Sequence, residues 1–220
     1  MFNFPEISKN LFILAVIHTL ISIYPKLSNY TPEIKFSIYR SMMCITFSIM
    51  GLNILINNFT CMKNPFSFTN DAMMEIFQLF TAYLILDFIQ MIATKCKRYD
   101  LYIHHIVCMG ALFISHITNS FGYIHSILFI AESLSVISGI DNMAIHDNDM
   151  ELSYYCKKIR KTIITYVRYP LWVLLILTTI YFTNNIPNLL WYNCLATGIS
   201  MLTLDHHWKK KCNKVINKYV

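Results

Sequence analysis

Apolar residues in this chain are gathered into long blocks that are separated by short polar segments. Most blocks are close to the length of about 20 residues that a helix needs to cross roughly 30 Å of hydrocarbon. They lack the period-two alternation that strands of a membrane-spanning barrel require. The pattern therefore predicts an all-α fold, a polytopic transmembrane helical bundle of about seven spans. The blocks cover residues 11–24, 36–56, 72–94, 101–117, 121–140, 163–182 and 187–204.

The first block is shorter than the others and ends at Pro25. It lacks the basic start and small-residue cleavage site of a signal sequence, so we predict a short N-terminal span beside a six-span core. Residues 141–161 are polar and charged, and we predict a solvated loop there. The predicted organisation is a lead and short first span (1–35), a transmembrane bundle (36–208) and a basic cytosolic tail (209–220).

Along the predicted bundle, connections rich in basic residues alternate with connections that contain few of them. With seven spans, every strongly basic connection falls on one face, and the positive-inside rule assigns that face to the cytosol. The N-terminus is then expected to be lumenal and the C-terminus cytosolic. The opposite connections offer Lys63 and little else. The basic connections carry Lys26 and Lys35, then Lys95, Lys97 and Arg98, then Lys157, Lys158, Arg160 and Lys161, and finally Lys209, Lys210, Lys211, Lys214 and Lys218.

Composition narrows the class of protein further. Hydrophobic residues make up 55% of the 220 residues and charged residues 14%, whereas about a quarter of a soluble domain is charged. A net charge of +6 would suit a nucleic-acid-binding protein. Here the positive residues lie in short connections, so we expect no nucleic-acid partner. The seven cysteines form no CxxC pair, which indicates neither a zinc site nor a disulfide framework.

Five ionisable residues within the blocks lie at a similar depth. At a rise of about 1.5 Å per residue, each lies within three helical turns of a basic connection. An ionisable group in hydrocarbon is normally paired or functional. We therefore predict that these residues, which come from four helices, line or seal one polar pocket open toward the cytosol. They are Asp87, His104, His105, Glu132 and Arg168.

The chemistry available to this set is acid–base catalysis. A histidine held by a carboxylate can accept a proton from an amine or a hydroxyl group, or attack an acyl group. The guanidinium of Arg168 can bind a phosphate or a carboxylate. A second interpretation stays open, in which the residues form an interhelical polar cluster that fixes helix register without any turnover.

Other polar groups receive plainer interpretations. His146 with Asp147 and Asp149 has a spacing too loose for a metal site. The HH pair inside the bundle lacks the companion boxes of a di-iron membrane enzyme, so we predict no metal site. Residues 205–208, with the sequence DHHW, are interpreted as part of the aromatic and basic belt at the membrane edge.

Four short motifs together resemble the TLC domain family of membrane proteins. The resemblance runs from about residue 36 to the C-terminal lysines, and the order and spacing of the motifs are more specific than any one of them. LILDFIQMI (84–92) resembles the family's Asp-containing helix, and RYDLYIHHIVCM (98–109) its helix that opens with paired histidines. IAESLSVI (130–137) resembles the Glu-x-Ser element of the small TLC proteins, and TYVRYPLW (165–172) the Arg-then-Pro helix.

The resemblance implies roles for individual residues. TLC-type ceramide synthases join a fatty acyl group from acyl-CoA to a sphingoid base, and their paired histidines are implicated in catalysis. By this resemblance His104 and His105 are catalytic candidates, and Ser115 and Asn119 fall on the Ser and Asn of the synthase motif. Glu132 falls where the synthases have the first of two aspartates.

The chain also departs from the synthase motif. Cys108 replaces a Thr, Ala131 replaces a His, and Ser135 replaces the second Asp. The chain is therefore more similar to the small TLC proteins, whose roles lean toward membrane lipid composition or lipid sensing, than to the full ceramide synthases.

We accordingly expect a multi-pass protein that binds a lipid or acyl chain and influences membrane lipid composition. One alternative is an acyl-CoA-dependent N-acyltransferase that uses His104 or His105, with acyl-CoA as co-substrate. A second is a trafficking factor for other membrane proteins. We expect no cofactor. Membrane lipids are the expected partners, a sphingoid base and acyl-CoA among them, and the oligomeric state is left open between a monomer and a homodimer. The expected location is the endoplasmic reticulum or another endomembrane. Heavy use of Ile, Asn, Lys and Tyr suggests an AT-rich genome, and if that genome is viral the expected location is a host membrane.

Overall fold

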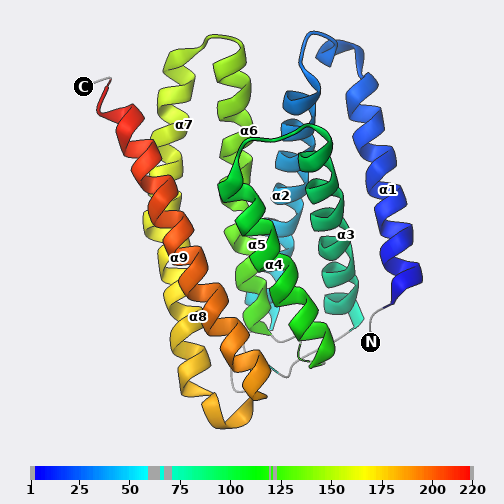
Figure 1. The fold of residues 1–220 in the computed structure, drawn as a ribbon, viewed down its shortest axis with the longest axis vertical. Coiled ribbons are helices and arrows are strands. Elements are labelled where there is room, and N and C mark those ends of the chain that lie inside the picture. Colours follow the sequence, from blue (N-terminus) through cyan, green and yellow to red (C-terminus); the bar gives the residue numbers. More distant parts are fainter. Residues whose placement is uncertain (1–2, 59–64, 67–70, 119, 121–122, 219–220) are drawn as a thin grey trace.

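The computed structural model of the protein describes residues 3–58, 65–66, 71–118, 120 and 123–218. Across these residues the regular structure is helical and includes no strand, which confirms the predicted all-α fold. Six helices are long and apolar enough to cross a membrane, which supports an integral multi-pass protein. The helices are α1 Phe4–Ile23, α2 Pro32–Asn57, α3 Asp71–Ala93, α4 Tyr99–Ile117, α5 Ser126–Ala131, α6 Ser133–His146, α7 Met150–Ile163, α8 Tyr169–Tyr181 and α9 Asn188–Ile216 (Figure 1).

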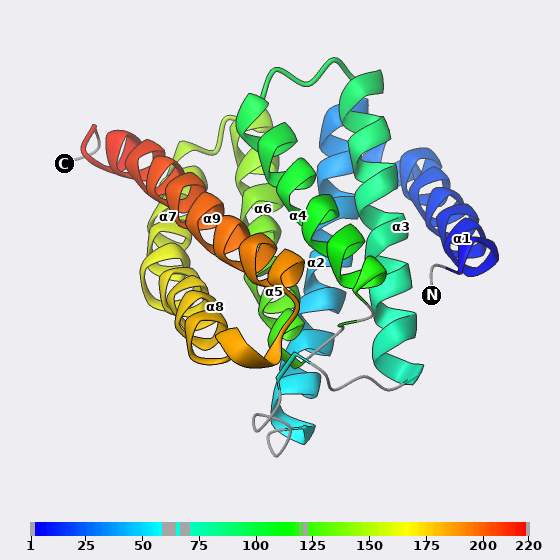
Figure 2. The same cartoon turned by 60° about the horizontal axis from the view of Figure 1, so that its bottom comes forward.

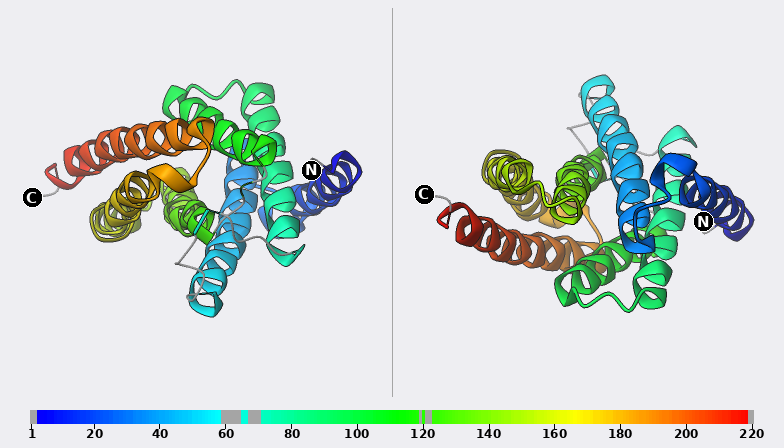
Figure 3. Two further views of the ribbon diagram at one scale, coloured as in Figure 1. Left: turned by 90° about the horizontal axis from the view of Figure 1, so that it is seen from below. Right: turned by 90° about the horizontal axis from the view of Figure 1, so that it is seen from above.

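The helices form a closed ring with α1 outside it (Figure 3). Around the ring, α2 packs on α3, α3 on α4, α4 on α9, and α9 on α7 and α8, while α5 and α6 close the ring against α2. Helix α1 packs mainly on α3 at the edge of the bundle (Figure 2). This arrangement matches the predicted six-span core with one added N-terminal span. Helix α9, which completes the ring, is 29 residues long but too polar to count among the six apolar candidates.

The basic connections lie at one end of the bundle. The α1–α2, α3–α4 and α6–α7 connections and the C-terminus are all at the upper end in Figure 1, which we call the basic end. The Tyr30 hydroxyl donates to Asp147 at 2.8 Å and so ties the α1–α2 connection to the α6–α7 turn. Hydrogen bonds from His146 and Tyr30 hold the pKa of Asp147 below its usual value. Lys63 lies outside the described residues.

The first helix begins earlier than the sequence predicts. Helix α1 starts at Phe4 within the predicted polar lead, because the Asn3 side chain accepts from the Glu6 N–H at 3.4 Å and Pro5 suits the first turn. The helix therefore has 20 residues, enough to cross the hydrocarbon, where the sequence had predicted a short span.

The predicted solvated loop over residues 141–161 is wrong. Helix α6 continues to His146, and α7 begins at Met150. The Asp141 carboxylate is 1% exposed and accepts from Ser153 at 2.8 Å, with Lys157 and Arg160 completing the cluster. The charges of this cluster are paired between α6 and α7 and so do not need solvent. Hydropathy along the chain does not reveal such pairing.

Two breaks in the helical hydrogen-bond pattern lie in the middle of the bundle. Glu132 occupies a turn between α5 and α6. Residues Ile164–Arg168 form a π-helical turn between α7 and α8, directly before Pro170. Proline has no N–H to donate and its ring crowds the preceding turn, so the helix relaxes there. Helix α9, by contrast, continues unbroken through residues 209–216 of the predicted tail.

Helix α2 approaches α5 and α6 closely at two glycines. A Cβ atom on Gly139 would lie 1.8 Å from Ser41 Oγ and 3.0 Å from the Ser37 carbonyl oxygen. One on Gly51 would lie 2.8 Å from Phe129 Cβ. Small residues at such crossings let helix backbones pack closely in a membrane protein.

These contacts predict that Gly51→Ala and Gly139→Ala each destabilise the bundle, by about 1–3 kcal/mol, because the added methyl group overpacks the crossing. Gly110→Ala on α4 is the matched control, since no atom lies within 4 Å of its Cβ position. Unfolding free energies in mixed micelles titrated with a denaturing detergent measure the effect. Wild-type stability in both crossing variants would contradict the described α2–α6 packing.

Candidate functional site

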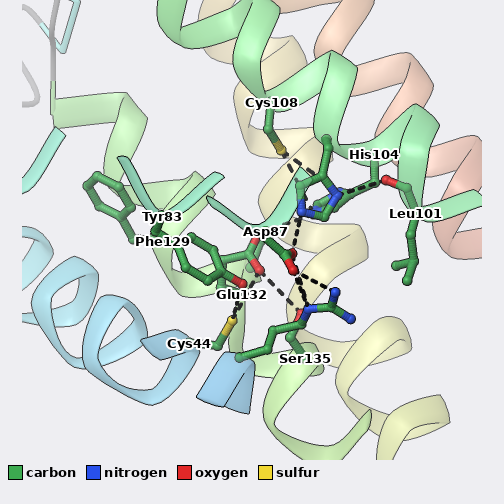
Figure 4. Close-up of polar contacts among 12 residues, drawn as sticks. Cys44, Tyr83, Asp87, Leu101, His104, Cys108, Phe129, Glu132 and Ser135 are labelled. Atoms are coloured by element: carbon green, nitrogen blue, oxygen red, sulfur yellow. Dashed lines mark hydrogen bonds and ion pairs between the residues drawn. The ribbon is translucent and has the colours of Figure 1, made fainter. Parts of the chain in front are cut away.

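All five predicted pocket residues line one cavity in the centre of the ring, and Figure 4 shows three of them, Asp87, His104 and Glu132. The sequence-based expectation that they meet is therefore correct. Each is at most 6% exposed. The space open to the centres of water molecules is about 30 Å³, enough for about two waters. The residues that meet there are Asp87, His104, His105, Glu132 and Arg168.

Of the two remaining predicted site residues, Ser115 is not in this cavity. Ser115 lies about three turns further along α4, where its hydroxyl bonds the Ala111 carbonyl at 2.9 Å and His125 Nε2 at 2.7 Å. Asn119 lies outside the described residues. The motif resemblance alone thus groups residues that the fold separates.

Asp87 is held by two cationic partners. Arg40 Nη2 donates to Asp87 Oδ1 at 2.6 Å, and Arg40 Nε lies 3.1 Å from both carboxylate oxygens. His105 Nε2 lies 2.5 Å from Asp87 Oδ2. The sequence analysis missed Arg40. The sequence did contain a feature that could have identified it, because Arg40 is the one charged residue in the apolar block 36–56.

The two histidines have different surroundings. Both ring nitrogens of His105 face acceptors, the Leu101 carbonyl oxygen at 2.8 Å and Asp87 at 2.5 Å. Because Asp87 is ionised against Arg40, both His105 nitrogens are assigned as N–H donors and the ring as an imidazolium. His105 then has no lone pair with which to accept a proton. It positions Asp87, and the acid–base candidate is His104.

His104 is held by Glu132 and keeps a nitrogen with no strong partner. Its Nε2 lies 3.4 Å from Glu132 Oε1, and its Nδ1 lies 3.9 Å from the Cys108 sulfur. The other Glu132 oxygen accepts from Ser135 at 3.2 Å and from Cys44 at 3.5 Å. Figure 4 shows these groups converging from α2, α4 and the α5–α6 break. The ligand atoms of His104, Cys108 and Glu132 all lie within 4.8 Å of one another.

Arg168 forms the third charged group. Its Nε lies 2.9 Å from each oxygen of Asp205, and Trp172 Nε1 donates to Asp205 at 2.7 Å. Its Nη1 donates to the Ala131 carbonyl oxygen at the α5–α6 break. The interpretation of Asp205 as a membrane-edge residue is wrong, because its side chain is 0% exposed. Among the described residues, the buried Nη2 of Arg168 has no hydrogen-bond partner.

A larger cleft adjoins the cavity at the basic end. It has a volume of about 410 Å³ and is lined by the start of α2, the α3–α4 connection and the end of α6. The cleft and the cavity share Ser37, Arg40, Arg98, Leu101 and Asn142. The cleft and the cavity therefore adjoin around Arg40.

The fold and its buried charges define a multi-pass α-helical membrane protein with a polar centre. No family model, curated protein or solved structure matches the chain. The TLC resemblance therefore stays a prediction from the motifs.

The pairing predicts that Asp87→Asn destabilises the protein by about 3–5 kcal/mol, because it leaves Arg40 and protonated His105 without their counter-charge. Glu151→Gln, an exposed carboxylate-to-amide change on α7, is the matched control and should leave stability unchanged. In a double-mutant cycle, the variant that combines Arg40→Met with Asp87→Asn should lose less unfolding free energy than the two single variants lose together. Additive effects would show that the two side chains are not coupled.

Proposed function

We propose that this protein is a TLC-type membrane protein that binds the polar end of a lipid or acyl-bearing molecule at the central cavity and influences membrane lipid composition. One observation carries the proposal. The ring has six helical segments when α5–α6 and α7–α8 are each counted as one, and every segment contributes a charged or titratable residue to one centre. They are Arg40 from α2, Asp87 from α3, His104 from α4, Glu132 from α5–α6, Arg168 from α7–α8 and Asp205 from α9.

A purely structural role accounts for only part of this centre. The Arg40–Asp87 and Arg168–Asp205 pairs would fix helix register by themselves. They do not account for His104, whose Nδ1 has only a distant thiol beside it, or for Arg168 Nη2, which is buried without a partner. A buried donor of this kind is strongly unfavourable unless something accepts its hydrogen bond. An oxygen of a carboxylate, phosphate or acyl carbonyl group suits it.

An apolar groove lies where the rest of such a molecule would go. The groove runs between α5 and α8 from Leu171 to Phe182 and has a volume of about 280 Å³. Leu171 follows Arg168 by three residues, so the groove starts less than one helical turn from the arginine. A hydrocarbon chain in the groove would place its polar end toward the cavity.

A second candidate function is N-acyl transfer, which the environment of His104 favours. In this reaction an amine, such as that of a sphingoid base, attacks the thioester carbonyl of acyl-CoA. His104 accepts the amine proton and returns it to the departing CoA thiolate, while Glu132 stabilises the transient imidazolium. The cleft at the basic end, which we assign to the cytosol, would admit CoA. The N-terminus is then lumenal and the membrane that of the endoplasmic reticulum or another endomembrane.

Lipid extraction and an acylation assay on the same purified protein test both functions. Wild type should retain a lipid through purification, or form N-acyl product from acyl-CoA and a sphingoid base. His104→Gln should lose that property while its unfolding free energy stays within about 1 kcal/mol of wild type. His206→Gln, an exposed histidine on α9, is the matched control and should behave as wild type.

The same assay separates the alternatives. His105→Gln should lower stability because it removes a partner of Asp87, whereas His104→Gln acts on function. Product loss in His104→Gln supports the transferase, and loss of lipid alone supports the binding protein. If folded wild type yields neither a lipid nor a product, both functions are overturned. The trafficking factor, which depends on the basic C-terminal part of α9, is then the remaining candidate.

A further inference from the structure

We propose that His104, Cys108 and Glu132 form a binding site for a zinc-like divalent cation. This goes beyond the proposed function, which needs no metal. It also replaces the sequence-based expectation of no metal site. That expectation rested on the lack of further histidine pairs like His104-His105. The other two ligands proposed here are instead a cysteine one turn along α4 and a glutamate from the α5–α6 break.

Three ligand atoms of the kinds that zinc prefers lie close together, all within 4.8 Å of one another. Zn–N and Zn–O bonds of about 2.1 Å put nitrogen and oxygen about 3.4 Å apart, and a Zn–S bond of about 2.3 Å puts nitrogen and sulfur about 3.6 Å apart. His104 Nε2 lies 3.4 Å from Glu132 Oε1 and 4.0 Å from the Cys108 sulfur. The sulfur lies almost equally far from the two His104 ring nitrogens, 3.9 Å from Nδ1 and 4.0 Å from Nε2, and so lies off the lone-pair axis of Nε2. Rotation of the Cys108 and His104 side chains must therefore accompany metal binding.

The surrounding groups support the ligands. His104 and Cys108 are four residues apart on α4, so they share one face of the helix. Glu132 keeps Oε1 available because Ser135 and Cys44 both donate to Oε2. Hydrogen bonds to the outer oxygen of a ligating carboxylate fix its orientation and are a regular feature of metal sites.

Charge and space are also consistent with a cation. The Cys108 thiol loses its proton to solvent when a metal binds, so the thiolate and Glu132 together balance a double positive charge. Of the neighbouring cationic groups, Arg168 is paired with Asp205, while Arg40 and His105 share Asp87. The cavity beside the ligands holds about two waters, so water can take a fourth position.

A bound cation would change the chemistry of the cavity. His104 Nε2 would be occupied as a ligand. A bound metal lowers the pKa of its water far below that of bulk water, and the hydroxide so formed would replace the imidazole as proton acceptor. The ligand class for the open position is then a group with an oxygen donor.

Metal content and cobalt spectroscopy test the proposal on the full chain, purified with a tag that contains no histidine. Zinc-supplemented wild type should carry about one zinc per chain by elemental analysis. Cobalt-substituted protein should show a near-ultraviolet thiolate-to-cobalt charge-transfer band, which Cys108→Ser abolishes. Affinity should fall as the pH falls, because protons compete for the thiolate and the imidazole.

Two further variants distinguish loss of a metal ligand from loss of folding. Cys108→His should keep the metal but lose the thiolate band, which a misfolded variant would not do. Cys194→Ser, a buried cysteine on α9 that is not a ligand here, should keep both. Wild type that is folded by circular dichroism yet carries no metal, or a cobalt band that survives in Cys108→Ser, would overturn the site.

Discussion

Burial of charge inside the hydrocarbon is the constraint on which the rest of the structure depends. An unpaired charge there is so unfavourable that each buried one must meet a partner. In this protein Asp87 meets Arg40 and Arg168 meets Asp205, and each pair joins two successive segments of the bundle. Since both pairs must form at once, few arrangements of the six helices satisfy them. The ring is the arrangement observed.

The same pairs determine how the two adjacent histidines differ. Asp87 and the Leu101 carbonyl oxygen occupy both nitrogens of His105, which becomes part of the framework. His104, one residue earlier on α4, points to Glu132 and Cys108 instead. Neighbouring residues on a helix face directions about 100° apart, so an HH pair in a crowded centre divides naturally into a positioning residue and a reactive one.

The irregular backbone lies at the same place as the buried charges. Glu132 interrupts the span formed by α5 and α6, and the π turn before Pro170 interrupts the span formed by α7 and α8. Arg168 comes from that π turn and bonds the Ala131 carbonyl oxygen beside the other break. Irregular backbone at membrane depth is tolerated where it is buried in protein or lines a polar space. Both breaks meet this condition, and π turns are frequent at functional sites.

The sequence by itself determined the helical class and the shared depth of the five polar residues, because hydropathy and a fixed rise per residue are local properties. Tertiary structure alone decided the pairings. Arg40 and Asp205 lie near the ends of their apolar segments, where a charge is equally well explained by solvent. Asp141 and the basic residues of α7 look like a solvated loop until two helices bring them together. Ser115 shares a motif with His104 but not a site. Which charges pair with each other depends on contacts between helices, and these contacts cannot be predicted from the residue pattern along a single helix.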